Sequence, residues 1–176
     1  WRVEHEELGV PCGLMARVVQ TLGETTYMDL DQARIEAEGR GDYRPVPGVE
    51  TFPFFLAVPE RPTMTPSDYH SSLGIHVEEH RPDVLDAMTQ FADFATRARD
   101  AMQARDLDKL GAVMDANFDL RCETFRLPER ETVAVQTCRK HGAHAKLAGG
   151  GGTLLGLLTD QNQRHALTNT LAQQNY

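Results

Sequence analysis

The sequence lacks any long run of apolar residues. Its longest apolar stretches are only a few residues each, and the one at 52–58 contains Pro53. Because a helix needs about 20 apolar residues to cross a membrane, we expect no membrane span. With 40% hydrophobic residues among 176, the chain can still build a core, which argues against wholesale disorder.

Basic residues are also scarce. The chain carries 18 Lys and Arg against 26 Asp and Glu, a net charge of -8, which argues against non-specific nucleic-acid binding because such binding needs a basic face. The deficit lies in one half. Residues 1–88 hold 16 acidic and 7 basic side chains, whereas residues 89–176 hold 10 and 11. We therefore expect an anionic ligand to bind in the second half.

Cysteines are few and widely separated. Cys12, Cys122 and Cys138 form no C-x-x-C pair, so neither a disulfide framework nor a zinc site is indicated, and a reducing compartment is the simplest expectation. The sequence shows no signal peptide, and it begins at Trp1, without an initiator Met, inside a predicted helix. We expect a cytoplasmic protein of which this sequence is a fragment.

Apolar spacing and turn residues predict a mixed fold. Helices are expected at 1–8, 13–22, 69–80, 82–104, 107–118, 129–141 and 160–173, and strands at 25–30, 43–46, 52–58, 143–148 and 153–158. The polar stretch 31–41 is expected to be a turn. These elements predict an α+β protein with a small, largely antiparallel sheet packed by several helices.

Four consecutive glycines, Gly149, Gly150, Gly151 and Gly152, separate the last two predicted strands. Glycine adopts positive φ freely and lets a ligand approach the backbone, whose N–H groups can hold an anion. Lys146 adds a positive charge nearby. The Gly-Lys-Ser/Thr of a Walker motif is absent. The alternative is a flexible hairpin linker that binds nothing.

A second segment, Gly9 to Arg17, places glycines and a proline at the start of a helix. A helix N-terminus has free N–H groups that can face a ligand. By itself this pattern is weak, and an ordinary helix start explains it better.

In this order and with this separation, the two segments resemble the GHMP small-molecule kinase superfamily. Pro11-Cys12-Gly13 matches the first superfamily motif, and Lys146 with the four glycines matches the second. The resemblance is closest to the glucuronokinases. It extends to three further segments: Met28-Asp29, His70-Ser71 and the Asn117 to Arg121 stretch.

The resemblance implies a GHMP kinase-like two-layer fold. Residues 1–58 would be the C-terminal part of the N-terminal lobe, and residues 59–176 a ferredoxin-like C-terminal lobe. The last strand of the C-terminal lobe would be missing, as would the phosphate-binding loop, which is expected before the first helix of this sequence. It also implies a kinase that uses ATP and Mg²⁺ to phosphorylate the anomeric hydroxyl of a sugar acid such as D-glucuronate. Lys146 and Gly149 to Gly152 would bind the nucleotide. The oligomeric state stays open.

Two departures from the superfamily pattern stand out. Ala16 occupies the position of the superfamily's aspartate, which accepts or orients the proton of the sugar hydroxyl, and Ala148 replaces a Thr or Ser. Arg17, the next motif residue, is present and could contact a phosphate or a sugar carboxylate. A non-catalytic binding protein, or pseudokinase, is therefore the alternative to an active kinase.

The segment His76 to His80 (HVEEH) offers a rival hypothesis, because it fits the H-x-x-E-H pattern of zinc peptidases, with Glu79 as the base. Pro82 follows closely and no third ligand is identifiable. A solvated helix end is the better interpretation, and a zinc hydrolase is a remote alternative.

Overall fold

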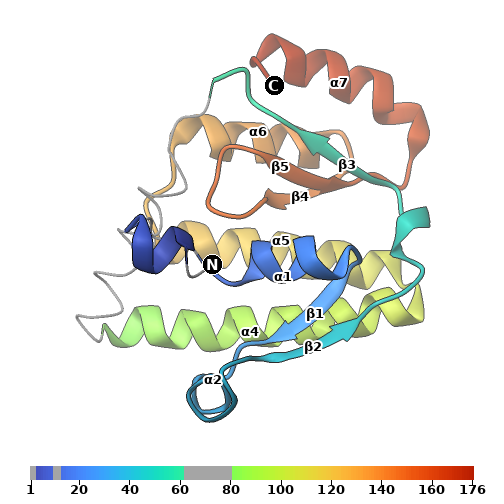
Figure 1. Cartoon of the computed structure of the whole chain (residues 1–176). Coiled ribbons are helices and arrows are strands. Elements are labelled where there is room, and N and C mark those ends of the chain that lie inside the picture. Colours follow the sequence, from blue (N-terminus) through green and yellow to red (C-terminus); the bar gives the residue numbers. More distant parts are fainter. Residues whose placement is uncertain (1–2, 10–12, 62–80) are drawn as a thin grey trace.

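The computed structural model describes residues 3–9, 13–61 and 81–176 (Figure 1). Its elements in chain order are a π-helical turn η1 (Val3–Glu7), α1 (Met15–Leu22), β1 (Thr26–Asp29), α2 (Gln32–Glu38), β2 (Asp42–Pro45), a 3₁₀ turn η2 (Val49–Thr51), β3 (Phe54–Ala57), α4 (Pro82–Ala104), α5 (Leu107–Thr124), α6 (Glu129–Lys140), β4 (His144–Leu147), β5 (Leu154–Leu157), η3 (Gln161–Gln163) and α7 (Arg164–Gln173). The α+β prediction is confirmed.

The strands form two antiparallel sheets rather than the single sheet expected. β1 pairs with β2, and β3, β5 and β4 form a three-stranded sheet with β5 in the centre. Leu157 of β5 pairs with Phe54 of β3 on one side and with His144 of β4 on the other. The two-stranded β1–β2 sheet packs on α4 instead of joining the other strands. There the Tyr27 hydroxyl lies 3.0 Å from Thr96 Oγ1.

β3 thus belongs to the same sheet as the last two strands. The domain boundary predicted after residue 58 falls between β3 and the rest of that sheet, and we propose instead a boundary before Pro53. The division into domains remains a prediction.

The three-stranded sheet is a middle layer with helices on both faces (Figure 1). Side chains alternate along a strand, so neighbouring leucines of the central strand face opposite ways. Leu154 and Leu158 are buried in one cluster with residues of α6 and α7, whereas Leu157 is buried in another with Leu110 and Met114 of α5. A strand covered on both faces accounts for the apolar run of 153–158.

Helix boundaries differ from the expectation at two places. α5 continues to Thr124 instead of ending near 118, so the stretch from Asn117 to Arg121 is helical. The predicted turn at 31–41 contains α2, whose N-cap Asp31 accepts a hydrogen bond from the N–H of Arg34 and whose C-cap is Gly39 with a φ of 71°. α2 has no buried residue, so capping rather than an apolar face defines it.

No helix among the described residues is long and apolar enough to cross a membrane.

Phe118 on α5 tests this core. It is only 1% exposed and lies in the cluster with α6 and the sheet. Phe118→Ala should lower the free energy of unfolding by about 3–5 kcal/mol through lost burial and a cavity. Urea denaturation measures this. Val133→Ala on α6, where the side chain is 47% exposed, is the control and should change stability by only about 0.5 kcal/mol. Equal effects of the two substitutions would contradict the assigned core.

Candidate functional site

The glycine loop, residues 148–153, joins β4 to β5 as a closed turn. Its ends are joined by a hydrogen bond from the N–H of Ala148 to the carbonyl of Thr153, at 2.8 Å. Gly149, Gly151 and Gly152 have φ angles of 58°, 143° and 78°. Residues that carry a Cβ rarely adopt these backbone conformations, so the shape of the turn requires glycine at these positions. The loop is thus a hairpin of defined shape, and the alternative that this hairpin binds nothing stays open.

Arg121 of α5 holds the first half of the loop. Its Nη1 donates to the carbonyl of Gly149 at 2.8 Å, and its Nη2 donates to the carbonyl of Gly150 at 2.6 Å. Arg121 is only 7% exposed. A rigid guanidinium that grips two successive carbonyls fixes the direction of both peptide groups.

Glu131 of α6 holds the second half. Its Oε1 accepts a hydrogen bond from the N–H of Gly152 at 2.9 Å, and the residue is only 1% exposed. The carboxylate also lies against Gly151, where a Cβ would come within 3.2 Å of Oε2. The loop is therefore fixed from two helices by side chains of opposite charge.

Lys146 lies on β4, two residues before the loop. It is half-buried, and its Nζ donates to the carbonyl of Leu147 at 3.0 Å. Burial, followed by the nearby positive charge of Arg121, lowers the pKa of Lys146 to about 8. A negative ligand would relieve both effects, because it would stabilise the protonated amine.

The loop can present three backbone donors. Among the described residues, the N–H groups of Gly149, Gly150 and Gly151 have no hydrogen-bond partner. The N–H of Gly152 donates to Glu131. Three of the four glycines, rather than all four, can therefore offer an N–H group to a ligand. Successive free backbone N–H groups are donors of the kind that hold phosphate, and Lys146 lies two residues before the loop.

Asp115 and Asp119 of α5 have a structural role. Asp115 Oδ2 lies 2.7 Å from His144 Nδ1, and Arg139 of α6 donates to both Asp115 and Asp119, at 3.2 and 2.8 Å. The two aspartates, four residues apart, thus share a helix face that Arg139 contacts. Gly111 makes room for the His144 ring, since a Cβ there would lie 2.1 Å from it. This network joins α5, α6 and β4 at the start of the strand.

The first sequence motif is only partly described. Residues 10–12, which include Pro11 and Cys12, lie outside the described residues, as do His70-Ser71 and the HVEEH segment at 76–80. Ala16 is exposed on α1, and the half-buried Arg17 donates from Nη1 to Gln20 at 3.1 Å. No hydrogen bond of the described residues joins Ala16 or Arg17 to the glycine loop. The zinc hypothesis is likewise not tested.

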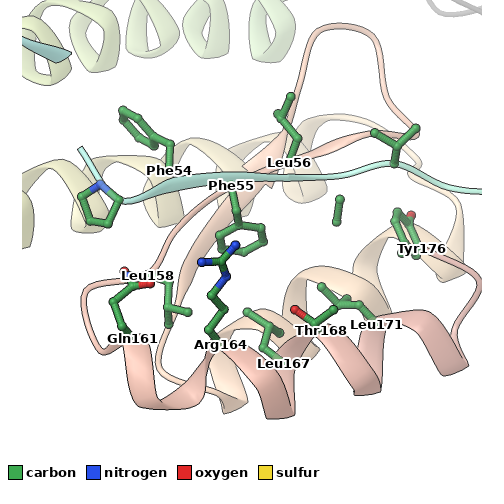
Figure 2. A pocket seen from close by; sticks show the side chains of 13 residues that line it. Phe54, Phe55, Leu56, Leu158, Gln161, Arg164, Leu167, Thr168, Leu171 and Tyr176 are labelled. Atoms are coloured by element: carbon green, nitrogen blue, oxygen red, sulfur yellow. Dashed lines mark hydrogen bonds between the residues drawn. The ribbon is translucent and has the colours of Figure 1, made fainter. Parts of the chain in front are cut away.

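A groove of about 360 Å³ lies elsewhere, between β3 and α7 (Figure 2). Phe54, Phe55 and Leu171 are among its lining residues, and Arg164 points into it beside Phe55. None of the site residues predicted from the sequence lines it. Most of its lining residues are apolar, and Gln161, Arg164 and Thr168 are polar.

Glu131 is the residue that sequence reasoning missed. A glutamate in the first turn of a helix is ordinarily explained by the helix dipole. Only its burial, and the contact with Gly152 across 21 residues of chain, distinguish it.

Comparison with known proteins finds a family model and relatives that are similar to the segment carrying this loop. Residues 98–176 match the family model described as "GHMP kinases C terminal". Glucuronokinase 1 of Arabidopsis thaliana is 28% identical over 154 residues, and probable glucuronokinase 2 of the same plant is 29% identical over 155 residues. Each alignment covers 86% of this chain but 42% of the relative, so the chain spans less than half the length of these curated relatives.

Two solved structures share the fold. Leishmania major mevalonate kinase, solved with R-mevalonate, superposes with a TM-score of 0.65 at 25% identity, over 78% of this chain and 43% of that one. The Lin0012 protein of Listeria innocua superposes with a TM-score of 0.68 at 11% identity, over 76% of this chain and 39% of that one. The resemblance predicted from the sequence is confirmed.

The lowered pKa of Lys146 can be tested with the three lysines of the chain, Lys109, Lys140 and Lys146. In an NMR titration of labelled lysine side chains, the Lys146 signal should reach its midpoint near pH 8. Lys109 is the internal control, because its hydrogen bond to Asp106 raises its pKa above 10.5. A Lys146 midpoint as high as that of Lys109 would contradict the described environment.

The same shift predicts a pH-dependent stability. Because the pKa of Lys146 is about 8 in the fold and 10.5 when unfolded, the unfolded state binds more protons between these values. The free energy of unfolding of the wild type, minus that of Lys146→Met, should therefore rise from pH 8 to pH 10.5.

Proposed function

We propose that this chain, whose residues 98–176 match the family model "GHMP kinases C terminal", is part of an ATP-dependent kinase that phosphorylates a sugar acid at its anomeric hydroxyl. The observation that carries the proposal is the glycine loop fixed by Arg121 and Glu131, with three backbone donors and Lys146 beside it. The names of the two plant relatives support D-glucuronate as the acceptor.

The loop fits what phosphoryl transfer needs from a protein. The transferred group carries spread-out negative charge, and catalysis rests mainly on positioning and on stabilising that charge. ATP, when bound, supplies the phosphoryl group. Gly149, Gly150 and Gly151 can each donate a backbone N–H to phosphate oxygens, and Lys146 can add a positive charge. The N–H of Gly152 does not face the phosphates in this proposal, because it donates to Glu131 Oε1.

Magnesium finds no obvious ligands in this part of the protein. Among the described residues, no group of three or more His, Cys, Asp or Glu side chains could hold a metal ion. Mg²⁺ usually keeps several waters and binds through one or two carboxylates and substrate phosphates. We therefore assign no residue of the described chain to Mg²⁺ and derive no step through it.

The second candidate function is a non-catalytic binding protein that keeps the loop. Ala16 favours it, because an exposed alanine in the first turn of α1 cannot accept the proton of a sugar hydroxyl. In our proposal, Arg17 contacts a phosphate or the carboxylate of the sugar acid. A cytoplasmic location completes the proposal and agrees with Cys122 and Cys138 being free thiols.

A coupled assay of ADP release from the full-length protein separates the two functions. An active kinase should release ADP from ATP only when D-glucuronate is present. For the non-catalytic protein, we expect ADP to bind without turnover, and Ala16→Asp to raise turnover by about 100-fold or more, the usual contribution of a positioned acid or base.

Ala33→Asp, at an exposed alanine in the first turn of α2, is the matched control and should leave turnover unchanged. A protein that neither turns over ATP nor binds ADP would contradict both functions.

A further inference from the structure

We propose that Arg121 and Glu131 are positioning residues that aim the N–H groups of Gly150 and Gly151 at the phosphates of the nucleotide. This inference rests on the proposed function for its ligand. Neither side chain needs to touch the nucleotide, because each acts through the backbone of the glycine loop.

The geometry of the peptide bond supplies the first step. In a trans peptide the carbonyl of one residue and the N–H of the next lie in one plane and point in opposite directions. The described residues contain no cis peptide. Arg121 draws the carbonyls of Gly149 and Gly150 toward α5. The N–H groups of Gly150 and Gly151 therefore point away from the guanidinium.

Glu131 fixes the end of the same turn. Its bond to the N–H of Gly152 prevents the Gly151–Gly152 peptide from rotating, and the carbonyl of the same peptide accepts a hydrogen bond from the N–H of Thr153. Gly151 must be glycine here, because its φ is 143° and the carboxylate occupies the space of a side chain. Two adjacent N–H groups are left pointing one way.

The burial of the two charges supports this role. A charged side chain that is almost fully buried costs free energy unless it is well hydrogen-bonded. Arg121 is 7% exposed and Glu131 is 1% exposed, and each side chain forms hydrogen bonds with the backbone of the loop. The charges of Arg121 and Glu131 are of opposite sign and offset each other. Lys146 then adds a further positive charge that an anion could meet.

Affinity for ADP and for adenosine, measured by calorimetry on the full-length protein, tests the inference. Arg121→Gln should weaken ADP binding about tenfold, the loss of roughly one charge-assisted hydrogen bond, while adenosine binding stays unchanged. Arg121→Lys should be intermediate, because it keeps the charge but not the two-pronged grip. Glu131→Ala should weaken ADP binding, and Glu131→Gln, which retains a carbonyl acceptor, should weaken it less.

Exposed residues of the same types provide matched controls. Arg126→Gln, just beyond α5, and Glu129→Gln, in the first turn of α6, should leave ADP affinity at the wild-type value. A merely structural role for Arg121 would lower the thermal stability and weaken ADP and adenosine equally, and that result would overturn the inference.

Hydrogen exchange of the ligand-free loop keeps the inference separate from the proposed function. The amides of Gly152 and Thr153, whose N–H groups are hydrogen-bonded in the loop, should exchange faster in Arg121→Gln and in Glu131→Ala than in the wild type or the controls. If the wild type binds no ADP, the proposed nucleotide function fails, and unchanged exchange in these variants would then overturn the positioning role as well. Faster exchange without ADP binding would retain the positioning of the loop and reject its ligand.

Discussion

The grip of Arg121 on two successive carbonyls is the interaction on which the candidate site depends. A run of four glycines has too much conformational freedom to hold one shape by itself. The guanidinium of α5 and the carboxylate of α6 restrict that freedom from two sides, at 2.6–2.9 Å from the backbone. The loop thus becomes a fixed set of donors at the end of a rigid strand pair, the arrangement that binding without large reorganisation requires.

The fold serves this grip by holding α5, α6 and β4 together. Arg139 and His144 meet at Asp115, which ties both helices to the strand that leads into the loop. Leu154 and Leu157 on the central strand bury opposite faces of the sheet, so β5 cannot shift relative to the helices without exposing one of them. The direction of the loop follows from this packing.

Local sequence signals were enough for most of the elements. The apolar runs predicted β3 and β5, Pro82 predicted the start of α4, and the glycines with Lys146 predicted the loop. The sequence could not reveal α2, because capping by Asp31 and Gly39 defines it without an apolar face. Nor could it show the roles of Arg121 and Glu131, since each contacts a residue more than 20 positions away. That information exists only in the tertiary packing.

An NMR titration of the full-length protein with ADP, labelled at all backbone amides, tests the central claim most directly. We expect the amides of Gly150 and Gly151 to shift most, because their N–H groups would donate to the phosphates, while Gly142, an exposed glycine after α6, stays unchanged. ADP binding that leaves the loop glycines unshifted, and moves signals of the β3–α7 groove instead, would contradict the account.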